Sequence, residues 1–420
     1  MENFREIAER FDAAAAWSRR RDSADLGALW LRLLGSPAEA RASRARSRTG
    51  RRRPRRHRAN PRAPGAARRR CPRPASRGRN RGVKAPRPSW SPWQRLYGAV
   101  LHQRRARLAR RAEHLPAPVV SVGNLHFGGG GKTPMTIALA THLRDRGLAV
   151  AILSRGYRRS SRGPLLVSRG NGPIVSWRAA GDEPYLLAEA LPGVAVAVAE
   201  ERVAAGRLAI ERLDRQPDLF LLDDGFSHAA LARDLDLLLF PADDPFARGR
   251  LAPSGRLREP LAAARHADAV ILTGAGPGDT TAGEGLAAAL RPYGFAGPGF
   301  ASPTGFLAPA LDAESRIVAV AGIARPASFF RRLEQEGVTI AARLPFADHH
   351  AYPDESMARI EGAFRRHRAT AVVATAKDAV KLAGRLSSPL LVAGIEARPE
   401  LAFWTWFDER IDALAGGGVR

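Results

Sequence analysis

The chain has 420 residues, and its 67 Lys and Arg side chains against 41 Asp and Glu give a formal net charge of +26. The excess is uneven, because residues 1–90 carry +19 and the other 330 residues carry only +7. Between Arg41 and Arg87 there are 20 basic residues and no acidic one, and so polar a stretch cannot build a hydrophobic core. We therefore expect a basic leader and a body of ordinary composition, long enough for two domains.

Composition also excludes several classes of protein. A single cysteine, Cys71, rules out a disulfide framework, and it has no metal-ligand spacing. The N-terminus, with Glu2, Glu6 and Glu9, lacks the features of a secretory signal. No apolar run approaches the roughly 20 residues that cross a bilayer. The sequence predicts a cytoplasmic protein that is soluble or peripheral on a membrane.

The leader, residues 1–88, begins with a predicted short helix from Glu2 to Trp17 and an apolar patch from Leu26 to Leu34, and then becomes Arg/Pro/Ala/Ser low complexity. One interpretation is disorder or a misassigned start codon, and the other is an arm that binds nucleic acid. No aromatic residue lies between Trp30 and Trp90, so bases would find no ring on which to stack. We expect a disordered leader and no specific nucleic acid as partner.

A predicted helix over residues 89–112 follows the leader. Aromatic and aliphatic side chains recur near helical spacing from Trp90 to Leu101, and five arginines follow between Arg104 and Arg111. Such a helix can lie in a membrane interface, with its rings among the headgroups and its arginines on anionic lipid. It can equally be an ordinary helix packed on the body, and these residues alone leave both interpretations open.

The body alternates strand and helix signals, which is typical of a mostly parallel sheet covered by helices on both faces. The first expected elements, in chain order, are Val119–Val122 (strand), Pro134–Arg146 (helix), Leu148–Leu153 and Val194–Ala199 (strands), about 200–213 (helix), and Leu219–Leu222, Leu235–Phe240 and Ala269–Thr273 (strands). A second set comprises Ile317–Ala321 (strand), Ala327–Glu336 (helix), Thr339–Leu344 (strand), Asp354–Arg366 (helix), and Ala371–Thr375 and Leu390–Val392 (strands). We expect one α/β domain over 113–305 and a smaller one over 306–420.

The strongest chemical signal is a glycine-rich run between the first strand and the first helix of the body. Its glycines let backbone N–H groups wrap a phosphate, and the helix N-terminus adds its positive dipole end. Lys132 can reach the β- and γ-phosphates, and Thr133 can offer its hydroxyl to Mg²⁺. His126 stands where the strict pattern has glycine, but the strand–loop–helix context predicts a P-loop NTPase-like fold. The predicted nucleotide-binding residues are His126, Phe127, Gly128, Gly129, Gly130, Gly131, Lys132 and Thr133.

Carboxylates follow the apolar strand Leu219–Leu222. Asp223 and Asp224 come directly after it and precede Gly225. A strand that ends in acidic residues is the usual partner of a P-loop, because its carboxylates hold Mg²⁺ directly or through water. Alone, such a turn is common, but together with the P-loop it predicts a metal site.

Four further motifs stand at strand ends or helix starts. Ser154–Tyr157 ends the strand after the P-loop helix, at the sheet edge where ligands bind. Gly181–Pro184 precedes a helical stretch and reads equally well as a simple N-cap. Arg256–Glu259 carries charges suited to phosphate and metal, although surface charge is the ordinary explanation. Asp348–His350 lies in a loop before a helix, where a histidine is usually structural.

Taken in order, these motifs resemble one family, the tetraacyldisaccharide 4'-kinases, which are the lipid A 4'-kinases of Gram-negative bacteria. The resemblance runs from about Ser91 to the C-terminal region, and the family's P-loop also lacks the leading glycine, so His126 no longer counts against it. The matching segments are Val119–Pro134 (VVSVGNLHFGGGGKTP), Ser154–Tyr157 (SRGY), Gly181–Pro184 (GDEP), Asp223–His228 (DDGFSH), Leu231–Asp234 (LARD), Leu257–Leu261 (LREPL), Asp348–His349 (DH) and Thr375–Lys381 (TAKDAVK).

The resemblance implies ATP-dependent, Mg²⁺-assisted phosphorylation of the 4'-hydroxyl of a lipid A disaccharide 1-phosphate precursor. It implies a peripheral position on the anionic inner face of the inner membrane, with residues 89–112 as the membrane-contacting helix, and no obligate protein partner. Asp182 and His349 would form the family's catalytic dyad, which domain closure would assemble. Asp182 orienting His349 makes a plausible general base near neutral pH.

The other candidates take supporting roles within that resemblance. A sugar hydroxyl that attacks a γ-phosphoryl group needs alignment and charge neutralisation rather than a covalent nucleophile. Lys132 would neutralise the transferring group as a catalytic residue. The expected metal ligands are Thr133, Asp223, Asp224 and Glu259, and the expected substrate or phosphate contacts are Arg155, Tyr157, Glu183 and Arg258.

Two positions depart from the family pattern, and the leader has no counterpart in it. Ser227 stands where glutamine is usual, and Ala376 replaces the acidic residue before Lys377. Neither touches the expected dyad, so we expect activity to survive. The alternatives are a P-loop ATPase stimulated by nucleic acid through the basic arm, and a GTPase-like metallochaperone, against which the missing Asn-Lys-x-Asp sequence speaks.

Overall fold

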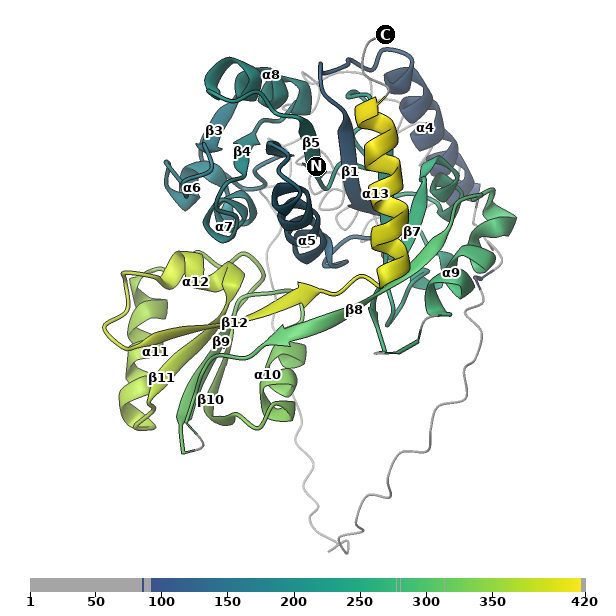
Figure 1. Cartoon of the computed structure of the whole chain (residues 1–420). Coiled ribbons are helices and arrows are strands. Elements are labelled where there is room, and N and C mark those ends of the chain that lie inside the picture. The colour runs from purple at the N-terminus through teal and green to yellow at the C-terminus, as the bar shows by residue number, and fades with distance from the viewer. Residues whose placement is uncertain (1–84, 87–91, 277, 280, 313, 417–420) are drawn as a thin grey trace, which may run out of the picture. The chain divides into compact units, whose positions relative to one another are not determined.

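The computed structural model describes residues 85–86 and 92–416, apart from 277, 280 and 313 (Figure 1). The chain divides into two units, residues 1–81 and 82–420, and every described residue belongs to the second unit. The predicted helix from Glu2 to Trp17, the apolar patch from Leu26 to Leu34, Trp90 and the disordered character of the leader all lie outside the described residues.

One sheet of twelve strands runs through the described part of the chain, and its strands lie in the order β10-β9-β11-β12-β8-β7-β6-β1-β5-β2-β4-β3. Their bounds are β1 (Val119–Asn124), β2 (Val150–Ser154), β3 (Leu165–Ser168), β4 (Ala195–Val198), β5 (Leu219–Asp223), β6 (Leu235–Pro241), β7 (Ala269–Ala275), β8 (Gly299–Leu307), β9 (Arg316–Ala321), β10 (Thr339–Pro345), β11 (Ala371–Thr375) and β12 (Leu390–Ala397). Neighbours pair in parallel except β3 with β4 and β12 with β8. The prediction of a mostly parallel α/β sheet is confirmed.

Helices connect the strands. The α-helices are α4 (Pro92–Ala109), α5 (Lys132–Asp145), α6 (Trp177–Ala180), α7 (Asp182–Ala190), α8 (Arg202–Arg212), α9 (Ala282–Leu290), α10 (Pro326–Gln335), α11 (Asp354–Arg366), α12 (Ala376–Leu382) and α13 (Leu401–Gly416), and short 3₁₀ turns are η2 (Ala247–Gly249), η3 (Leu261–His266) and η4 (Arg291–Tyr293). Among the described residues, no helix has both the length and the apolar character that crossing a membrane requires.

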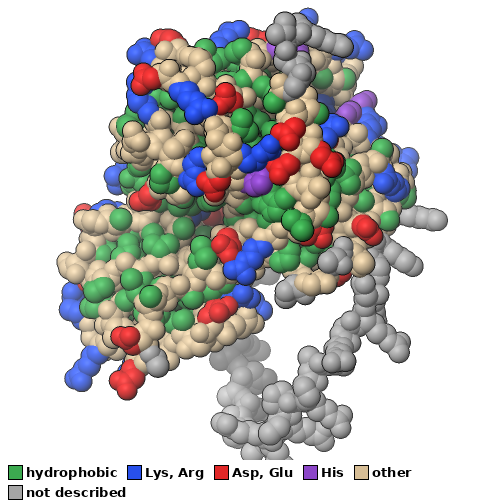
Figure 2. Space-filling view, viewed as in Figure 1, with side chains coloured by type: hydrophobic (Ala, Val, Ile, Leu, Met, Phe, Trp, Pro, Cys, Tyr) green, Lys and Arg blue, Asp and Glu red, His purple; other side chains and the backbone are tan. Residues whose placement is uncertain are grey.

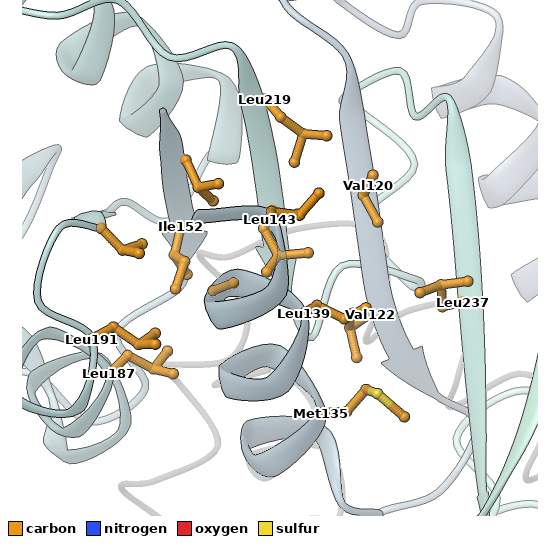
Figure 3. Close-up of a cluster of buried hydrophobic side chains, with 14 of the residues drawn as sticks. Val120, Val122, Met135, Leu139, Leu143, Ile152, Leu187, Leu191, Leu219 and Leu237 are labelled. Carbon is orange, nitrogen blue, oxygen red and sulfur yellow. The ribbon is translucent and has the colours of Figure 1, made fainter. Parts of the chain in front are cut away.

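Strand periodicity decides which helix covers which face of the sheet. Val120 and Val122 of β1 point into a core shared with α5, α7 and α13, whereas Val119 points to the opposite core, which α8 covers. Figure 3 shows the first core, in which Leu139 and Leu143 of α5 lie against the strands. Because both faces are covered here, every residue of β1, β2 and β5 is buried, and β2 and β5 are apolar up to their last residue.

A second lobe, formed by β9–β12 with α10, α11 and α12, has two smaller cores of its own. Strand β8 joins it to the rest of the sheet, because its first half pairs with β7 and its second half with β12. Helix α13 leaves this lobe and inserts Phe403 and Phe407 into the core around α5. The division into 113–305 and 306–420 stays a prediction, although the return of α13 shows that the chain passes between the two parts twice.

The sequence missed β3, β8 and several helices, namely α6, α9, α12 and α13, because short or alanine-rich segments give weak periodicity. The predicted helix Pro134–Arg146 begins two residues earlier, at Lys132, directly after the glycines. Figure 2 shows Lys/Arg and Asp/Glu side chains interspersed over the viewed face. That mixture agrees with the nearly balanced charge of the body.

Candidate active site

The glycine-rich loop lies between β1 and α5 and is shaped by close backbone approaches. Gly128 and Gly131 have positive φ angles of 95° and 76°, which disfavour any side chain. A Cβ at Gly130 would stand 2.3 Å from Asn124 Nδ2. No side chain caps the first turn of α5, so its N–H groups are available to a phosphate, as the sequence predicted.

Lys132 opens α5 and points back across the loop. Its Nζ donates to Asn124 Oδ1 at 3.3 Å and lies 3.8 Å from Asp224 Oδ1. Thr133 follows it in the first turn of α5. The P-loop cation and the carboxylates after β5 therefore meet at one strand edge, which is the arrangement that the two motifs predicted.

His126 and Phe127 lie in the loop before the glycines. His126 is buried, forms an isolated bridge with Leu257, and has its pKa lowered to about 4 by burial and by the charge of Arg256. Phe127 donates its N–H to the Arg256 carbonyl at 2.8 Å. His126 is therefore neutral at pH 7 and helps to fix the loop on the 250–258 segment rather than supplying charge to a phosphate.

The carboxylates after β5 have opposite electrostatic surroundings. Burial raises the pKa of Asp223, and the carboxylates of Glu183 and Asp224 raise it further. Burial acts in the same direction on Asp224, but Arg258 and Lys132 outweigh it and hold its pKa well below the ordinary value. Arg258 grips Asp224 with both terminal nitrogens, one of them 3.1 Å from Oδ2.

These residues fit a divalent cation with few protein ligands. Two negative charges are forced together in a buried place at Asp223, which a cation would relieve, and Mg²⁺ commonly takes one or two carboxylates together with phosphate and water. Glu259, the fourth expected ligand, is paired with α4, because its Oε2 accepts from Arg105 at 3.1 Å. No cluster of three His, Cys, Asp or Glu side chains suited to a metal occurs within the described ranges.

Asp182 and His349, 167 residues apart, are joined directly. His349 Nδ1 lies 2.9 Å from Asp182 Oδ2. Asp182 begins α7 and is only 6% exposed, and His349 lies in the loop after β10, where its own N–H donates to the Gly322 carbonyl at 3.3 Å. The ring of Tyr157 packs edge-on against His349 with centroids 5.4 Å apart. The structure therefore brings together the two residues that the sequence proposed as a dyad.

Two lysines of α12 complete this cluster, and sequence reasoning gave them no role. Lys381 Nζ lies 2.9 Å from Asp182 Oδ2, and Lys377 Nζ lies 2.9 Å from Glu183 Oε1. Glu183, expected to contact substrate, therefore contacts Lys377 in this structure. The signal was present in the TAKDAVK segment, where two lysines stand four residues apart.

A second missed residue is Arg202, which is 4% exposed at the start of α8. Its Nη1 donates to the Ala199 and Glu200 carbonyls at 3.3 and 3.1 Å. Burial lowers its pKa to about 10, with a smaller contribution from the positive charge of Arg155 and against the attraction of Asp224. Arg155 and Arg202 thus add positive charge to the strand edge that holds Asp223 and Asp224.

Comparison with known proteins decides the family. The family model described as tetraacyldisaccharide-1-P 4'-kinase matches residues 88–412. The chain belongs to this family.

Individual relatives agree with that assignment. A tetraacyldisaccharide 4'-kinase of Geobacter sulfurreducens is 42% identical over 312 residues, which cover 72% of this chain and 87% of the relative. One from Anaeromyxobacter dehalogenans is 43% identical over 283 residues, covering 63% and 72% of the two chains. The solved structure of LpxK from Aquifex aeolicus in complex with ATP is 32% identical, has a TM-score of 0.61, and covers 77% of this chain and 97% of its own.

Family membership confirms the predicted resemblance and the enzyme class, a kinase that phosphorylates a hydroxyl group of a lipid A precursor. It gives no support to the alternative of a nucleic-acid-stimulated ATPase. Of the two departures from the family pattern, Ala376 is the first residue of α12, whose N-cap is the Thr375 hydroxyl, an acceptor from Asp378 N–H at 3.2 Å. The exchange therefore leaves the start of α12 capped.

Proposed function

We propose that this chain uses ATP, bound at Gly128–Thr133, to phosphorylate the 4'-hydroxyl of the disaccharide 1-phosphate, with His349 as general base and Asp182 as its partner. The observation that carries the proposal is the 2.9 Å contact between His349 Nδ1 and Asp182 Oδ2 at the strand edge that also carries the P-loop. The ATP bound by the Aquifex aeolicus relative supports the choice of donor.

The proton path follows from the geometry of the pair. Asp182 Oδ2 accepts from Nδ1, so Nε2 is left to accept the hydroxyl proton while the sugar oxygen bonds to the γ-phosphorus and ADP leaves. Burial would raise the pKa of Asp182, but the His349 hydrogen bond and the charge of Lys377 hold it well below the ordinary value. Asp182 therefore stays anionic at neutral pH and fixes the imidazole.

Charge at the phosphoryl group is handled by the other strand ends. Lys132, whose Nζ lies 3.8 Å from Asp224 Oδ1 beside the loop, is the proposed cation for the γ-phosphate. Thr133, Asp223 and Asp224 would hold Mg²⁺, which neutralises the transferring group when it is bound. Arg155, Tyr157 and Arg258 remain the proposed contacts to substrate or phosphate, and Glu259 would have to leave Arg105 to reach the metal.

Helix α4 is the proposed contact with the anionic inner face of the inner membrane. Leu96 and Val100 are 58% and 47% exposed, and Arg104 and Arg107 continue the same helix face. Arg105, which is partly buried, pairs with Glu259 and lies 4.4 Å from the Phe226 ring centroid. One face is thus anchored and the other presents apolar and basic groups, the combination that interfacial helices use.

The direct test is conversion of detergent-dispersed disaccharide 1-phosphate lipid to the bis-phosphorylated product with ATP and Mg²⁺. We expect wild type to turn over, Lys132→Ala to lose most activity, and added DNA or RNA to change nothing. Equal turnover by wild type and Lys132→Ala would contradict the P-loop assignment. Stimulation by nucleic acid without lipid phosphorylation would contradict the function itself.

A further inference from the structure

Helix α12 brings two ammonium groups to the Asp182–His349 pair. Lys377 and Lys381 stand four residues apart, so both side chains leave the same face of the helix, one turn from each other. Lys381 Nζ lies 2.9 Å from Asp182 Oδ2, and Lys377 Nζ lies 3.2 Å from His349 Nε2. Each member of the pair thus has its own cation.

The N-terminus of α12 is fixed by buried hydrogen bonds. The Thr375 hydroxyl accepts from Asp378 N–H at 3.2 Å and donates to its Oδ2 at 2.6 Å. The same carboxylate accepts from Gly322 N–H at 2.8 Å, and Asp378 has no exposed surface. The Gly322 carbonyl in turn receives the N–H of His349. The helix that carries the lysines and the loop that carries the imidazole therefore share one rigid support.

Lys381 is so deeply buried that it requires a permanent counter-ion. Its side chain is 2% exposed, and an ammonium so far from water requires an anion in contact. Asp182 is that anion, and its Oδ2 faces both Lys381 Nζ and His349 Nδ1. Lys381 Nζ meets Asp182 Oδ2 as an ion pair and has no hydrogen-bond partner among the described residues.

Lys377 decides which nitrogen of His349 carries the proton. An ammonium has only donors, so its contact at 3.2 Å requires a lone pair on Nε2 and leaves the hydrogen on Nδ1, facing Asp182. This is the tautomer that a base acting through Nε2 needs. Lys377 keeps a second contact with Glu183 at 2.9 Å, so a sugar hydroxyl can take its place at Nε2 while its charge remains nearby.

We infer that Lys377 and Lys381 are positioning residues for the general base: Lys381 holds Asp182 in place, and Lys377 keeps Nε2 of His349 as the acceptor. The inference rests on the proposed function, since it gives the two lysines their role through the dyad. It gives a role to the TAKDAVK segment, which takes no part in the proposed phosphate and metal sites.

Positively and negatively charged groups surround His349, and the experiment must separate their effects. Helix α12 contributes Lys377 and Lys381. Helix α7 contributes Asp182 directly and Glu183 through its contact with Lys377. From its own loop comes Asp348, whose Oδ2 is 3.9 Å from Nε2 and whose carbonyl accepts from Arg158, and from the loop after β2 comes the Tyr157 ring. The positive charges in this group belong to the two lysines and Arg158.

The experiment is the pH profile of kcat/KM for lipid phosphorylation by the full-length enzyme carrying Lys377→Met or Lys381→Met. Removing a positive charge makes protonation of His349 easier, so the acidic side of the profile should move to higher pH by about one pH unit, with kcat lowered about tenfold. Lys377→Arg, which keeps the charge, should restore the wild-type profile. Arg385→Met removes a charge in the turn after α12, where the guanidinium pairs with exposed Asp354, and should change neither.

An unshifted acidic limb in Lys377→Met would overturn the inference, and so would a shift of the same size in Arg385→Met. If Lys381→Met is too unstable to assay, the profiles of Lys377→Met and Lys377→Arg decide the matter. Failure of the proposed function looks different: His349→Ala would then keep near-normal turnover in the same assay. If His349→Ala loses turnover as expected but the lysine variants keep the wild-type pH profile of kcat/KM, only the positioning role is rejected.

Discussion

Single residues at this site are held in backbone conformations that side chains rarely adopt. Asp224 and His349 both lie in the left-handed region, with φ of 55° and 60°. For residues other than glycine this costs about 1 kcal/mol or more, and it persists only where neighbours fix the side chain. Arg258 does so for Asp224, and Asp182 does so for His349. Two of the seven residues other than glycine with positive φ, among those that the structure describes, thus lie in the proposed site.

The first prediction concerns the dyad. Asp182→Asn keeps the shape of the side chain but removes its charge, and His349→Ala removes the base, so each should lower kcat about 10²-fold or more. Because the two act as a unit, the double variant should be little worse than the poorer single one. Steady-state kinetics with the disaccharide lipid measures both effects.

Asp354→Asn provides the matched control, because that carboxylate is fully exposed and pairs only with Arg385 among the described ion pairs. It should leave kcat unchanged. Losses that multiply in the double variant would show that Asp182 and His349 contribute separately, against the proposed pair.

At the scale of one element, α9 shows how packing rather than propensity decides the effect of a substitution. Gly283 and Gly285 lie on the same helix, and neither has a positive φ. A Cβ at Gly283 would stand 2.3 Å from the Phe300 carbonyl carbon of β8, whereas one at Gly285 would meet nothing within 4 Å. The first glycine permits contact between helix and strand, and the second does not serve that purpose.

We therefore predict opposite signs for the same exchange. Gly283→Ala should reduce the free energy of unfolding by about 1–3 kcal/mol, because backbone must move to admit the methyl group. Gly285→Ala should increase it by about 0.5–1 kcal/mol through helix propensity. Urea unfolding of both variants measures the difference, and equal effects would contradict the packing argument.

Helix α4 supplies a second prediction at this scale. Leu96→Glu with Val100→Glu places charge on its exposed apolar positions and should weaken sedimentation with anionic vesicles severalfold, without changing Tm. Ile174→Glu, at a position 56% exposed but remote in sequence from α4, is the control and should bind as wild type does. Vesicle binding that survives the α4 substitutions would place the membrane contact elsewhere.

For the whole molecule, the decisive feature is that the proposed site draws on segments from both ends of the body. β8 and α13 connect the second lobe to the core around α5, and Arg325 pairs with Asp243 where α10 begins. His142 of α5 stacks on Trp404 of α13, with ring centroids 4.3 Å apart. The P-loop helix is thereby packed against the last helix of the chain.

The start of this body lies slightly earlier than residue 89, and that can be tested. Ala85 packs on the core around Leu286, and the Pro86 carbonyl accepts from the Tyr293 hydroxyl. Removal of residues 1–84 should leave turnover and Tm unchanged, whereas removal of residues 1–88 should lower Tm by about 2 °C, the effect of roughly one lost hydrogen bond. Differential scanning calorimetry measures both, and loss of folding in the shorter deletion would contradict this boundary.

The sequence by itself determined the parts that depend on neighbouring residues. Most strands and helices of the body, the glycine-rich run at Gly128–Thr133 and the carboxylates at Asp223 and Asp224 were predicted from local periodicity and spacing, because a strand, a turn and a helix start are each built from a few consecutive residues. The resemblance also named Asp182 and His349 before any contact was known.

Which side chains come into contact across the sheet depends on the tertiary structure. The ion pair of Lys381 with Asp182, the contact of Lys377 with His349 and the pairing of Glu259 with Arg105 join residues 28 to 199 positions apart. No local signal encodes such distances, since they depend on how twelve strands are ordered and on which loops then share an edge. The net charge of +26 likewise said nothing about these cations, each of which acts through the side chains that the fold places beside it.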